Sequence, residues 1–185
     1  MKTFFVSDHH FYHNNILKFE VDGNSIRPFD SLYEMHKCLI DRHNALVEPN
    51  DKVYFLGDVG FSVNATGLDY LSSMNGNKVL IMGNHDGYGS IAQYLKYFDK
   101  ILSSKSFTID QTTGILTHIP VHTSQLENRY VFNIHGHLHT RNLDDERYLN
   151  VSVEQNDFGP ISLESVKEIF KRRGLLDKQT SSNSN

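Results

Sequence analysis

Short runs of β-branched and aromatic residues alternate along the chain with segments whose apolar residues recur every three or four positions. The first pattern is typical of β-strands, and the second is typical of helices that pack on a sheet. Strands are predicted at Thr3–Ser7, Lys52–Leu56, Lys78–Ile81, Phe107–Asp110, Gly114–Thr117, Val131–Ile134 and Tyr148–Val151. Strands interleaved with helices in this way predict an α/β protein.

The strongest helix signal lies between the first two predicted strands. Ser31-Leu32-Tyr33-Glu34 has the form of a capping box, which favours a helix start at Ser31. The apolar positions that follow share one face, with Cys38 beside them: Leu32, Met35, Leu39 and Leu46. We expect this helix to run to about Val47.

Two histidines of this helix, His36 and His43, are expected at its surface or at the edge of the core. Weaker helix signals occur at residues 63–71 and 90–97. A final amphipathic helix is predicted around residues 163–170, where a glycine soon afterwards favours its end.

Composition indicates an ordinary globular protein of 185 residues, with 38% hydrophobic and 22% charged residues. The net charge of −4 provides no overall positive field that would attract nucleic acid or an anionic membrane. The single cysteine, Cys38, excludes an internal disulfide and any multi-cysteine metal site. We expect one domain over residues 1–176, followed by a disordered tail at 177–185.

Neither a signal peptide nor a membrane span is expected. The first apolar run, around residues 3–6, is too short for a signal peptide, and no later run approaches the length that spans a membrane. One cysteine in the whole chain is typical of a reducing compartment. We therefore expect a cytoplasmic protein with no membrane partner, and its oligomeric state is left open.

Histidine is the unusual component, with 11 residues in 185. Residues of the metal-ligand type fall just after successive predicted strands: Asp8 and His10, then Asp58, then Asn84, His85 and Asp86, then His118, and finally His137 and His139. That edge is where open α/β sheets place their sites. Asp8 and His10 are two apart and should project to the same side of an extended chain. Each residue alone is more often a turn or capping residue, but together they predict two metal sites that share one carboxylate.

The same residues form a series of motifs, D-x-H, G-D, G-N-H-D, an isolated H and G-H-x-H. They stand at Asp8/His10, Gly57-Asp58, Gly83-Asn84-His85-Asp86, His118 and Gly136-His137-Leu138-His139. In order, spacing and strand context this series resembles the calcineurin-like metallophosphoesterase superfamily, over the chain from Phe4 to about Phe170. Further segments resemble small standalone phage and bacterial members: Ser7–Ile16, Arg27-Pro28-Phe29 and Leu149–Glu154. The resemblance implies a four-layer α/β/β/α sandwich of mixed sheets with the active site at the C-terminal edge of the strands.

The resemblance also implies a role for each motif residue. One metal would be held by Asp8, His10 and His139, the other by Asn84, His118 and His137, and Asp58 would bridge them. The two cations would neutralise a phosphate ester and lower the pKa of a shared water, whose hydroxide attacks phosphorus in line. His85 would protonate the leaving oxygen or stabilise its charge, and Asp86 would either orient His85 or cap the following turn.

Three further residues are candidate substrate contacts: His13, Arg27 and His122. Packing at a helix start is the alternative for His13, and a salt bridge in its loop is the alternative for Arg27. The aromatic residues Phe11, Tyr12 and Phe61 lie near the expected site in sequence, where a ring can stack on a base.

Two divalent cations are the expected cofactors. Histidine, aspartate and asparagine suit manganese, iron, zinc, nickel or cobalt, and the resemblance favours manganese. Magnesium alone fits poorly with several imidazoles.

The expected activity is phosphoester hydrolysis, with a phosphodiester favoured and a nucleotide or nucleic-acid phosphate as substrate. A phosphomonoesterase or phosphoprotein phosphatase is the alternative within the enzyme class. The alternative outside it is a non-catalytic, metal-stabilised interaction module, which would not need a general acid such as His85.

Overall fold

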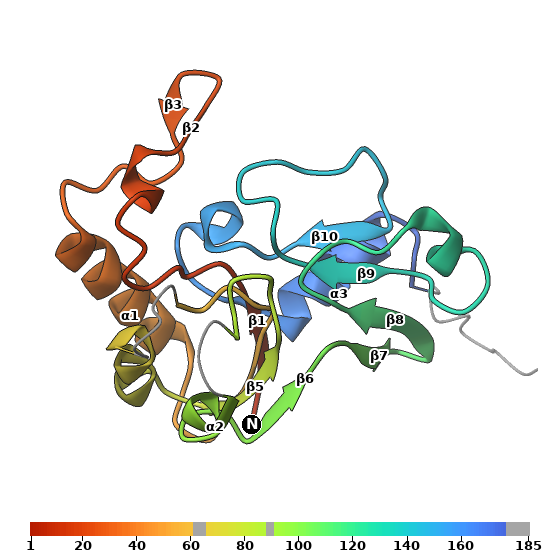
Figure 1. Cartoon of the computed structure of the whole chain (residues 1–185). Helices are drawn as coiled ribbons and strands as arrows, with labels where there is room; N and C mark the ends of the chain where they lie inside the picture. Colours follow the sequence, from red (N-terminus) through yellow and green to blue (C-terminus); the bar gives the residue numbers. More distant parts are fainter. Residues whose placement is uncertain (61–65, 88–90, 177–185) are drawn as a thin grey trace, which may run out of the picture.

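A five-stranded mixed sheet forms one half of the fold (Figure 1). The computed structural model describes residues 1–60, 66–87 and 91–176. In spatial order the strands are β11 (Ile161–Ser162), β1 (Thr3–Val6), β4 (Lys52–Phe55), β5 (Asn77–Ile81) and β6 (Lys100–Leu102). The last four are parallel to one another, and β11 is antiparallel to β1. The carboxyl ends of β1, β4 and β5 therefore meet at one edge.

A second mixed sheet contains, in spatial order, β10 (Tyr148–Asn150), β9 (Asn133–His135), β8 (Thr112–Leu116) and β7 (Lys105–Ile109). The first three strands are parallel, and β7 and β8 form an antiparallel hairpin. A separate hairpin of β2 (Glu20–Val21) and β3 (Asn24–Ser25) projects away from both sheets (Figure 1). Its turn residues, Asp22 and Gly23, have positive φ angles, which this tight turn requires.

Helices cover the outer face of the first sheet. Helix α1 (Leu32–Leu46) begins as expected, because the Ser31 hydroxyl accepts a hydrogen bond from the Glu34 N–H. It packs with η2 (Thr66–Ser73) and α2 (Ile91–Tyr94) on β4 and β5. Met35 and Leu39 are the buried apolar residues of α1 in this core.

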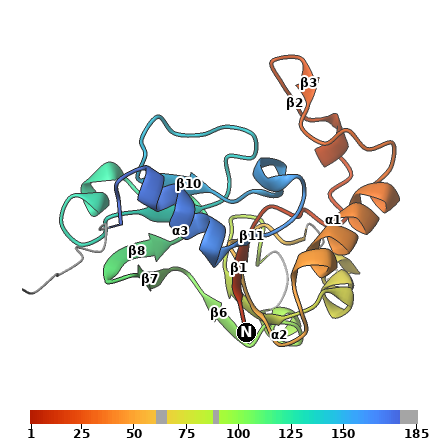
Figure 2. The ribbon, with the colours of Figure 1, turned by 180° about the vertical axis from the view of Figure 1, so that it is seen from behind.

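The second core lies between the sheets and includes residues of both, such as Phe5 and Ile134. Helix α3 (Leu163–Arg172) contributes Val166 and Phe170 to it and lies beside β11 (Figure 2). On the far side of the second sheet, η3 (Thr123–Leu126) packs Leu126 beside Ile115. The remaining 3-10 helices are η1 (Ile16–Lys18) and η4 (Val153–Asn156). The predicted fold class, a layered α/β sandwich of two mixed sheets, is confirmed.

The seven predicted strands are all present, with ends that differ by one or two residues. The short strands β2, β3, β6 and β11 were not predicted. The expectation for 63–71 was wrong in type, because residues 66–73 form a 3-10 helix, and 63–65 lie outside the described residues. Of the helix expected at 90–97, Ile91–Tyr94 is helical and residue 90 is not described. The expected tail at 177–185 also lies outside the described residues.

The long helix departs from expectation at one apolar side chain. Leu46 was expected on the buried face but is 50% exposed, because it lies in the last turn of α1, beyond the edge of the sheet core. His36 and His43 are buried, which excludes the surface, one of the two positions that were expected for them. Across the described ranges, no helix is long and apolar enough to cross a membrane.

Candidate metal centre

The seven predicted metal ligands lie together at the edge where β1, β4, β5, β8 and β9 end. Asp8, His10 and His139 form cluster one, and Asp58, His118 and His137 form cluster two. Within each cluster, one ligand-type atom per residue lies within 4.8 Å of the others. Such compact groups are compatible with divalent metal ions.

Asp58 stands between the two clusters. Its Oδ2 lies 3.2 Å from His118 Nε2 in cluster two and 3.7 Å from His10 Nε2 in cluster one. The Asn84 side-chain oxygen lies 3.0 Å from the same His118 nitrogen. One carboxylate oxygen therefore faces both clusters, as a bridging ligand must.

The backbone that carries these residues is strained. Five of them have φ angles between +51° and +71°: Asp8, His10, Asp58, His137 and His139. Each left-handed non-glycine residue costs about 1–3 kcal/mol, and such strain gathers at functional sites. The expectation that Asp8 and His10 lie on an extended chain was therefore wrong, because the chain turns sharply at both residues. His9 between them packs against Phe55, with ring centroids 5.1 Å apart.

The motif glycines permit the close approach of the loops. A Cβ atom on Gly83 would lie 2.2 Å from Asp58 Oδ1, and one on Gly136 would lie 2.5 Å from Asp8 Oδ2. At Gly57 the φ angle is +90°, and a Cβ atom would lie 2.6 Å from the Gly83 Cα. Any side chain at these positions would push the ligand loops apart.

Cluster one contains buried polar atoms that no described residue satisfies. Asp8 Oδ1 and both ring nitrogens of His10 have no hydrogen-bond partner within the described part of the chain. The other oxygen of Asp8 accepts hydrogen bonds from the His137 N–H and the Ser152 hydroxyl, both at 2.9 Å. Unsatisfied buried polar atoms are costly, and a cation bound by Asp8 Oδ1 and one His10 nitrogen would satisfy two of these three atoms. The donor set of imidazoles, carboxylates and an amide therefore fits divalent transition metals.

Hydrogen bonds behind the clusters orient two of the imidazoles. His118 Nδ1 lies 2.7 Å from the Leu56 carbonyl oxygen, so it donates there and Nε2 faces Asp58. His139 Nδ1 lies 2.9 Å from Glu154 Oε1. Burial alone would lower the pKa of His118, but the hydrogen bond and negative charge of Asp58 prevail and raise it to about 9. The Asp58 carboxylate therefore favours the protonated form of His118.

Arg27 and Glu154, a residue that the sequence did not single out for the site, lie behind cluster one. The Glu154 carboxylate is buried and accepts from Arg27 Nε at 2.9 Å as well as from His139. Burial alone would raise the pKa of Glu154, but the Arg27 charge and the His139 hydrogen bond prevail and lower it. The expected phosphate contact of Arg27 was wrong, because its side chain is fully buried. The alternative, a salt bridge, is what the structure contains.

His85 is the partly open histidine beside Asp58. Its Nε2 lies 4.0 Å from Asp58 Oδ2, and its side chain is 31% exposed. Its backbone N–H donates to Asp58 Oδ1 at 2.8 Å. The ring lies 5.4 Å from that of His10, measured between centroids. His85 therefore faces solvent where the two clusters meet.

Asp86 has backbone partners that the sequence did not predict. Its carboxylate accepts backbone N–H bonds from Gly83, Asp58 and Val59 at 2.8, 2.9 and 3.1 Å. It therefore joins the loop after β4 to the loop after β5. Burial raises the pKa of Asp86 to about 6.

The two remaining candidate contacts differ in position. His13 lies at the rim of cluster one, with its ring centroid 5.4 Å from that of His10 and 6.2 Å from that of His85. Its carbonyl also accepts from Ile16 N–H, as expected for packing at the start of η1. His122 is exposed, and its Nδ1 accepts from the Ser124 N–H at the start of η3. The structure thus gives His122 a capping role.

The aromatic residues named from the sequence differ in solvent exposure. Phe11 is fully buried, so its ring is not available to a substrate. Tyr12 is 41% exposed, and Phe61 lies outside the described residues. Phe19, which the sequence did not single out, is 45% exposed, with its ring centroid 5.6 Å from that of His13. Tyr12 and Phe19 are therefore the exposed aromatic side chains of this segment.

Two mixed sheets carry histidine and carboxylate clusters that are compatible with divalent metal ions at their common edge. A family model described as calcineurin-like phosphoesterase matches residues 1–181, and the chain belongs to this family. Its substrate is accordingly a phosphate ester.

The chain is also similar to other proteins along most of its length. An uncharacterized protein of Methanocaldococcus jannaschii is 32% identical over an alignment of 185 positions that covers 92% of each chain. The gene 66 protein of Mycobacterium phage L5 is 25% identical over 167 residues, covering 75% of this chain and 77% of that protein. The crystal structure of a protein of unknown function from Aquifex aeolicus superposes with a TM-score of 0.73 at 26% identity, covering 91% of this chain and 98% of that one.

Proposed function

We propose that this chain is a two-metal phosphodiesterase that acts on a nucleotide or a nucleic-acid end. The observation that carries the proposal is the position of Asp58, whose Oδ2 faces His10 of cluster one and His118 of cluster two. Two cations held by clusters one and two would neutralise the phosphate and lower the pKa of an attacking water. Manganese is the proposed metal, since it accepts imidazole, carboxylate and amide ligands together.

His85 is proposed as the general acid. Its ring is partly open to solvent and lies within 4.0 Å of Asp58 Oδ2, so it can reach an ester oxygen on a phosphate held at the clusters. In this role its ring N–H donates the proton that the leaving alkoxide takes up. A non-catalytic metal-binding module would have no use for a partly exposed histidine at this point.

Exposed aromatic rings support a nucleotide substrate over a phosphoprotein. The Phe19 ring packs against His13, and the His13 ring lies next to that of His85. Tyr12 is partly exposed two residues after His10 and has a φ angle of +60°, a strained conformation for a bulky residue. Base stacking on an aromatic side chain contributes about 1–3 kcal/mol per base. The net charge of −4 favours a short substrate over a long nucleic acid.

The proposal is tested with metal-stripped protein reloaded with Mn²⁺ and assayed on bis(p-nitrophenyl) phosphate and p-nitrophenyl phosphate. The wild type should cleave the diester faster than the monoester, and Asp58→Asn should cleave neither. Asp51→Asn is the matched control, because Asp51 is also buried and accepts backbone N–H bonds, but at the other end of β4. It should keep the wild-type kcat.

Faster cleavage of the monoester would favour the phosphomonoesterase alternative. Absence of turnover on both substrates, with two Mn²⁺ ions bound per chain, would contradict an enzymatic role for the centre.

A further inference from the structure

We infer that Arg27 is a positioning residue that acts through Glu154 to give cluster one its metal affinity, while the affinity of cluster two depends on Arg27 far less. This inference rests on the proposed function, because it concerns the same two clusters. Arg27 is itself too deeply buried to touch a substrate.

The guanidinium of Arg27 joins the two loops that supply cluster one. It donates to the backbone carbonyl oxygens of Asp8 and His9, the latter at 2.7 Å. Its Nε and a terminal nitrogen both lie 2.9 Å from Glu154 Oε1. The same Glu154 oxygen accepts from His139 Nδ1. A planar guanidinium can hold these partners at once, whereas a lysine ammonium cannot reproduce the fork.

The loops held in this way are the strained ones. Asp8, His10 and His139 all have positive φ angles, and residues in such conformations persist only when their surroundings fix them. Arg27 fixes the Asp8–His9 backbone directly and fixes the His139 ring through Glu154. Cluster one therefore depends on a buried ion pair between residues 127 positions apart in sequence.

Cluster two is supported differently. His118 is oriented by the Leu56 carbonyl, and the Asp58 loop is held by the Asp86 carboxylate. Neither of these two contacts involves Arg27 or Glu154, although the clusters also meet through the His137 N–H bond to Asp8 Oδ2 and the His10 N–H bond to the Asp58 carbonyl. Loss of the Arg27 fork should therefore affect the two clusters unequally.

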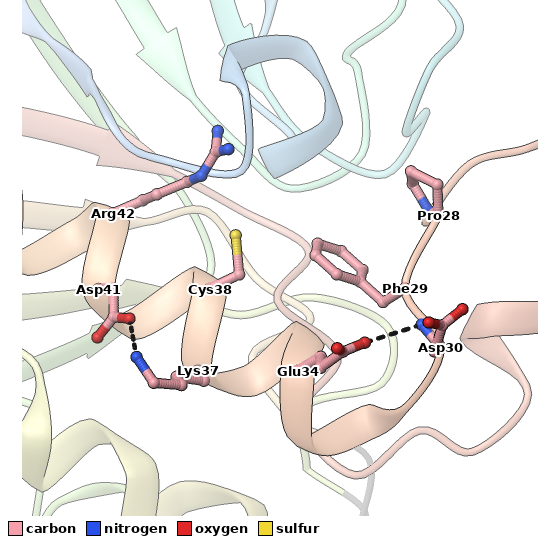
Figure 3. Close-up of a pocket in the computed structure, with 8 residues that line it drawn as sticks. All are labelled: Pro28, Phe29, Asp30, Glu34, Lys37, Cys38, Asp41 and Arg42. Carbon is pink, nitrogen blue, oxygen red and sulfur yellow. Dashed lines mark hydrogen bonds and ion pairs between the residues drawn. The ribbon is translucent and has the colours of Figure 1, made fainter.

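Arg27 reaches the site from an outer segment of the molecule. It follows the projecting β2–β3 hairpin, and Pro28 and Phe29 after it line a surface pocket over α1 (Figure 3). Charged groups in that pocket are engaged with near neighbours, as in the ion pair of Lys37 with Asp41. The pocket thus adds no ligand to the centre, and the contribution of this segment to the site is the Arg27 side chain.

The test is a calorimetric titration of the metal-stripped full chain with Mn²⁺, which needs no substrate. Two ligand-deletion backgrounds separate the clusters: His118→Ala leaves cluster one, and His10→Ala leaves cluster two. Adding Arg27→Met should weaken Mn²⁺ binding about 10–100-fold in the His118→Ala background. In the His10→Ala background the change should stay within about twofold.

Two further variants test whether the loss of Mn²⁺ affinity reflects misfolding rather than loss of the Arg27 contacts. Arg27→Met combined with Glu154→Leu removes both buried charges, so neither is left unpaired, and it should fold while still losing affinity at cluster one. Arg173→Met is the matched control, because Arg173 also contacts one glutamate and two backbone carbonyls, at Glu146 and Tyr148. It should leave both affinities unchanged. Circular dichroism of each metal-free variant reports the fold.

Equal weakening in both backgrounds, or no weakening in either, would overturn the inference. A wild-type chain that binds fewer than two Mn²⁺ ions would contradict the proposed function, and the inference with it. If the wild type binds two Mn²⁺ ions and Arg27→Met changes neither affinity, the inference alone would be contradicted and the proposed function would stand.

Discussion

The buried histidines of helix α1 and those of the candidate metal centre differ in backbone conformation and in hydrogen bonding. His36 and His43 lie on the regular helix α1, and each has one nitrogen bonded to the backbone: His36 Nε2 accepts from the Tyr12 N–H, and His43 Nε2 bonds the Asn75 carbonyl. His10 has a left-handed backbone conformation, and neither of its ring nitrogens has a hydrogen-bond partner among the described residues. Its Nε2 faces the carboxylates of Asp8 and Asp58. Burial and residue type are the same in both groups. Strain and convergence on other ligands are what distinguish a candidate metal ligand from a core histidine.

The largest expected effect comes from replacing one histidine of each group by alanine. His10→Ala should lower kcat/KM on the diester by at least about 10³-fold, because cluster one loses a ligand. His43→Ala should leave kcat near wild type and lower the free energy of unfolding by about 2–4 kcal/mol, because it empties a packed core position. Urea denaturation of the metal-free proteins checks stability. Comparable losses of activity in both variants would contradict the distinction between a candidate metal ligand and a core histidine.

A smaller loss of activity is expected at a histidine that lies at the centre without being a ligand. His85→Ala should lower kcat by about 10²–10³-fold, because the general acid is lost. Both Mn²⁺ ions should remain, as measured by metal analysis after dialysis. Loss of a metal with high residual turnover would show that His85 is a ligand rather than the acid.

The strained loops can also be tested through their glycines. Gly83→Ala should lower the free energy of unfolding by about 3 kcal/mol and weaken Mn²⁺ binding, because its Cβ would overlap Asp58 Oδ1. Gly159→Ala is the control, since the nearest atom to its Cβ, Leu46 Cδ1, lies at an ordinary 3.5 Å. Its unfolding free energy should change by less than about 0.5 kcal/mol. Equal stability of both variants would mean that the loops are not closely packed.

The smallest expected effect is the pH dependence of the core histidines. Burial lowers the pKa of His43 to about 4 from its ordinary value of 6.5. The unfolded chain therefore binds a proton below pH 6.5 that the folded chain does not bind until about pH 4, so acid favours unfolding. His43 should reduce the unfolding free energy by on the order of 2 kcal/mol between pH 6.5 and pH 4.

His43→Gln should remove this contribution. Its unfolding free energy, measured in urea on metal-free protein, should fall less steeply with decreasing pH than that of the wild type. Parallel pH profiles would mean that His43 is protonated equally in both states.

Sequence patterns predicted the parts of this fold that depend on local order. The capping box at Ser31 marked the start of α1, and strand-end motifs brought seven ligand-type residues to one edge. The Asp22-Gly23 pair is a turn signal, but the strands of the β2–β3 hairpin have only two residues each, which is too short for a recognisable strand pattern. Strand β11 is equally short and is fixed by pairing with β1 at the other end of the chain.

The remaining features depend on contacts that sequence order does not contain. Arg27 and Glu154 meet only in the folded chain, so the buried ion pair behind His139 could not be read from spacing. Asp86 follows a ligand motif, yet its partners lie mainly on the loop after β4. The left-handed turns at Asp8 and His10 could not be predicted from side-chain alternation along a strand, because alternation assumes an extended chain.

The most direct test of the account is an X-ray structure of the Mn²⁺-loaded protein with anomalous difference density at the manganese edge. The account predicts two peaks about 3.5–4 Å apart. Asp8, His10 and His139 should contact the first, Asn84, His118 and His137 the second, and Asp58 both. A single peak, or peaks that Asp58 does not join, would contradict a shared two-metal centre.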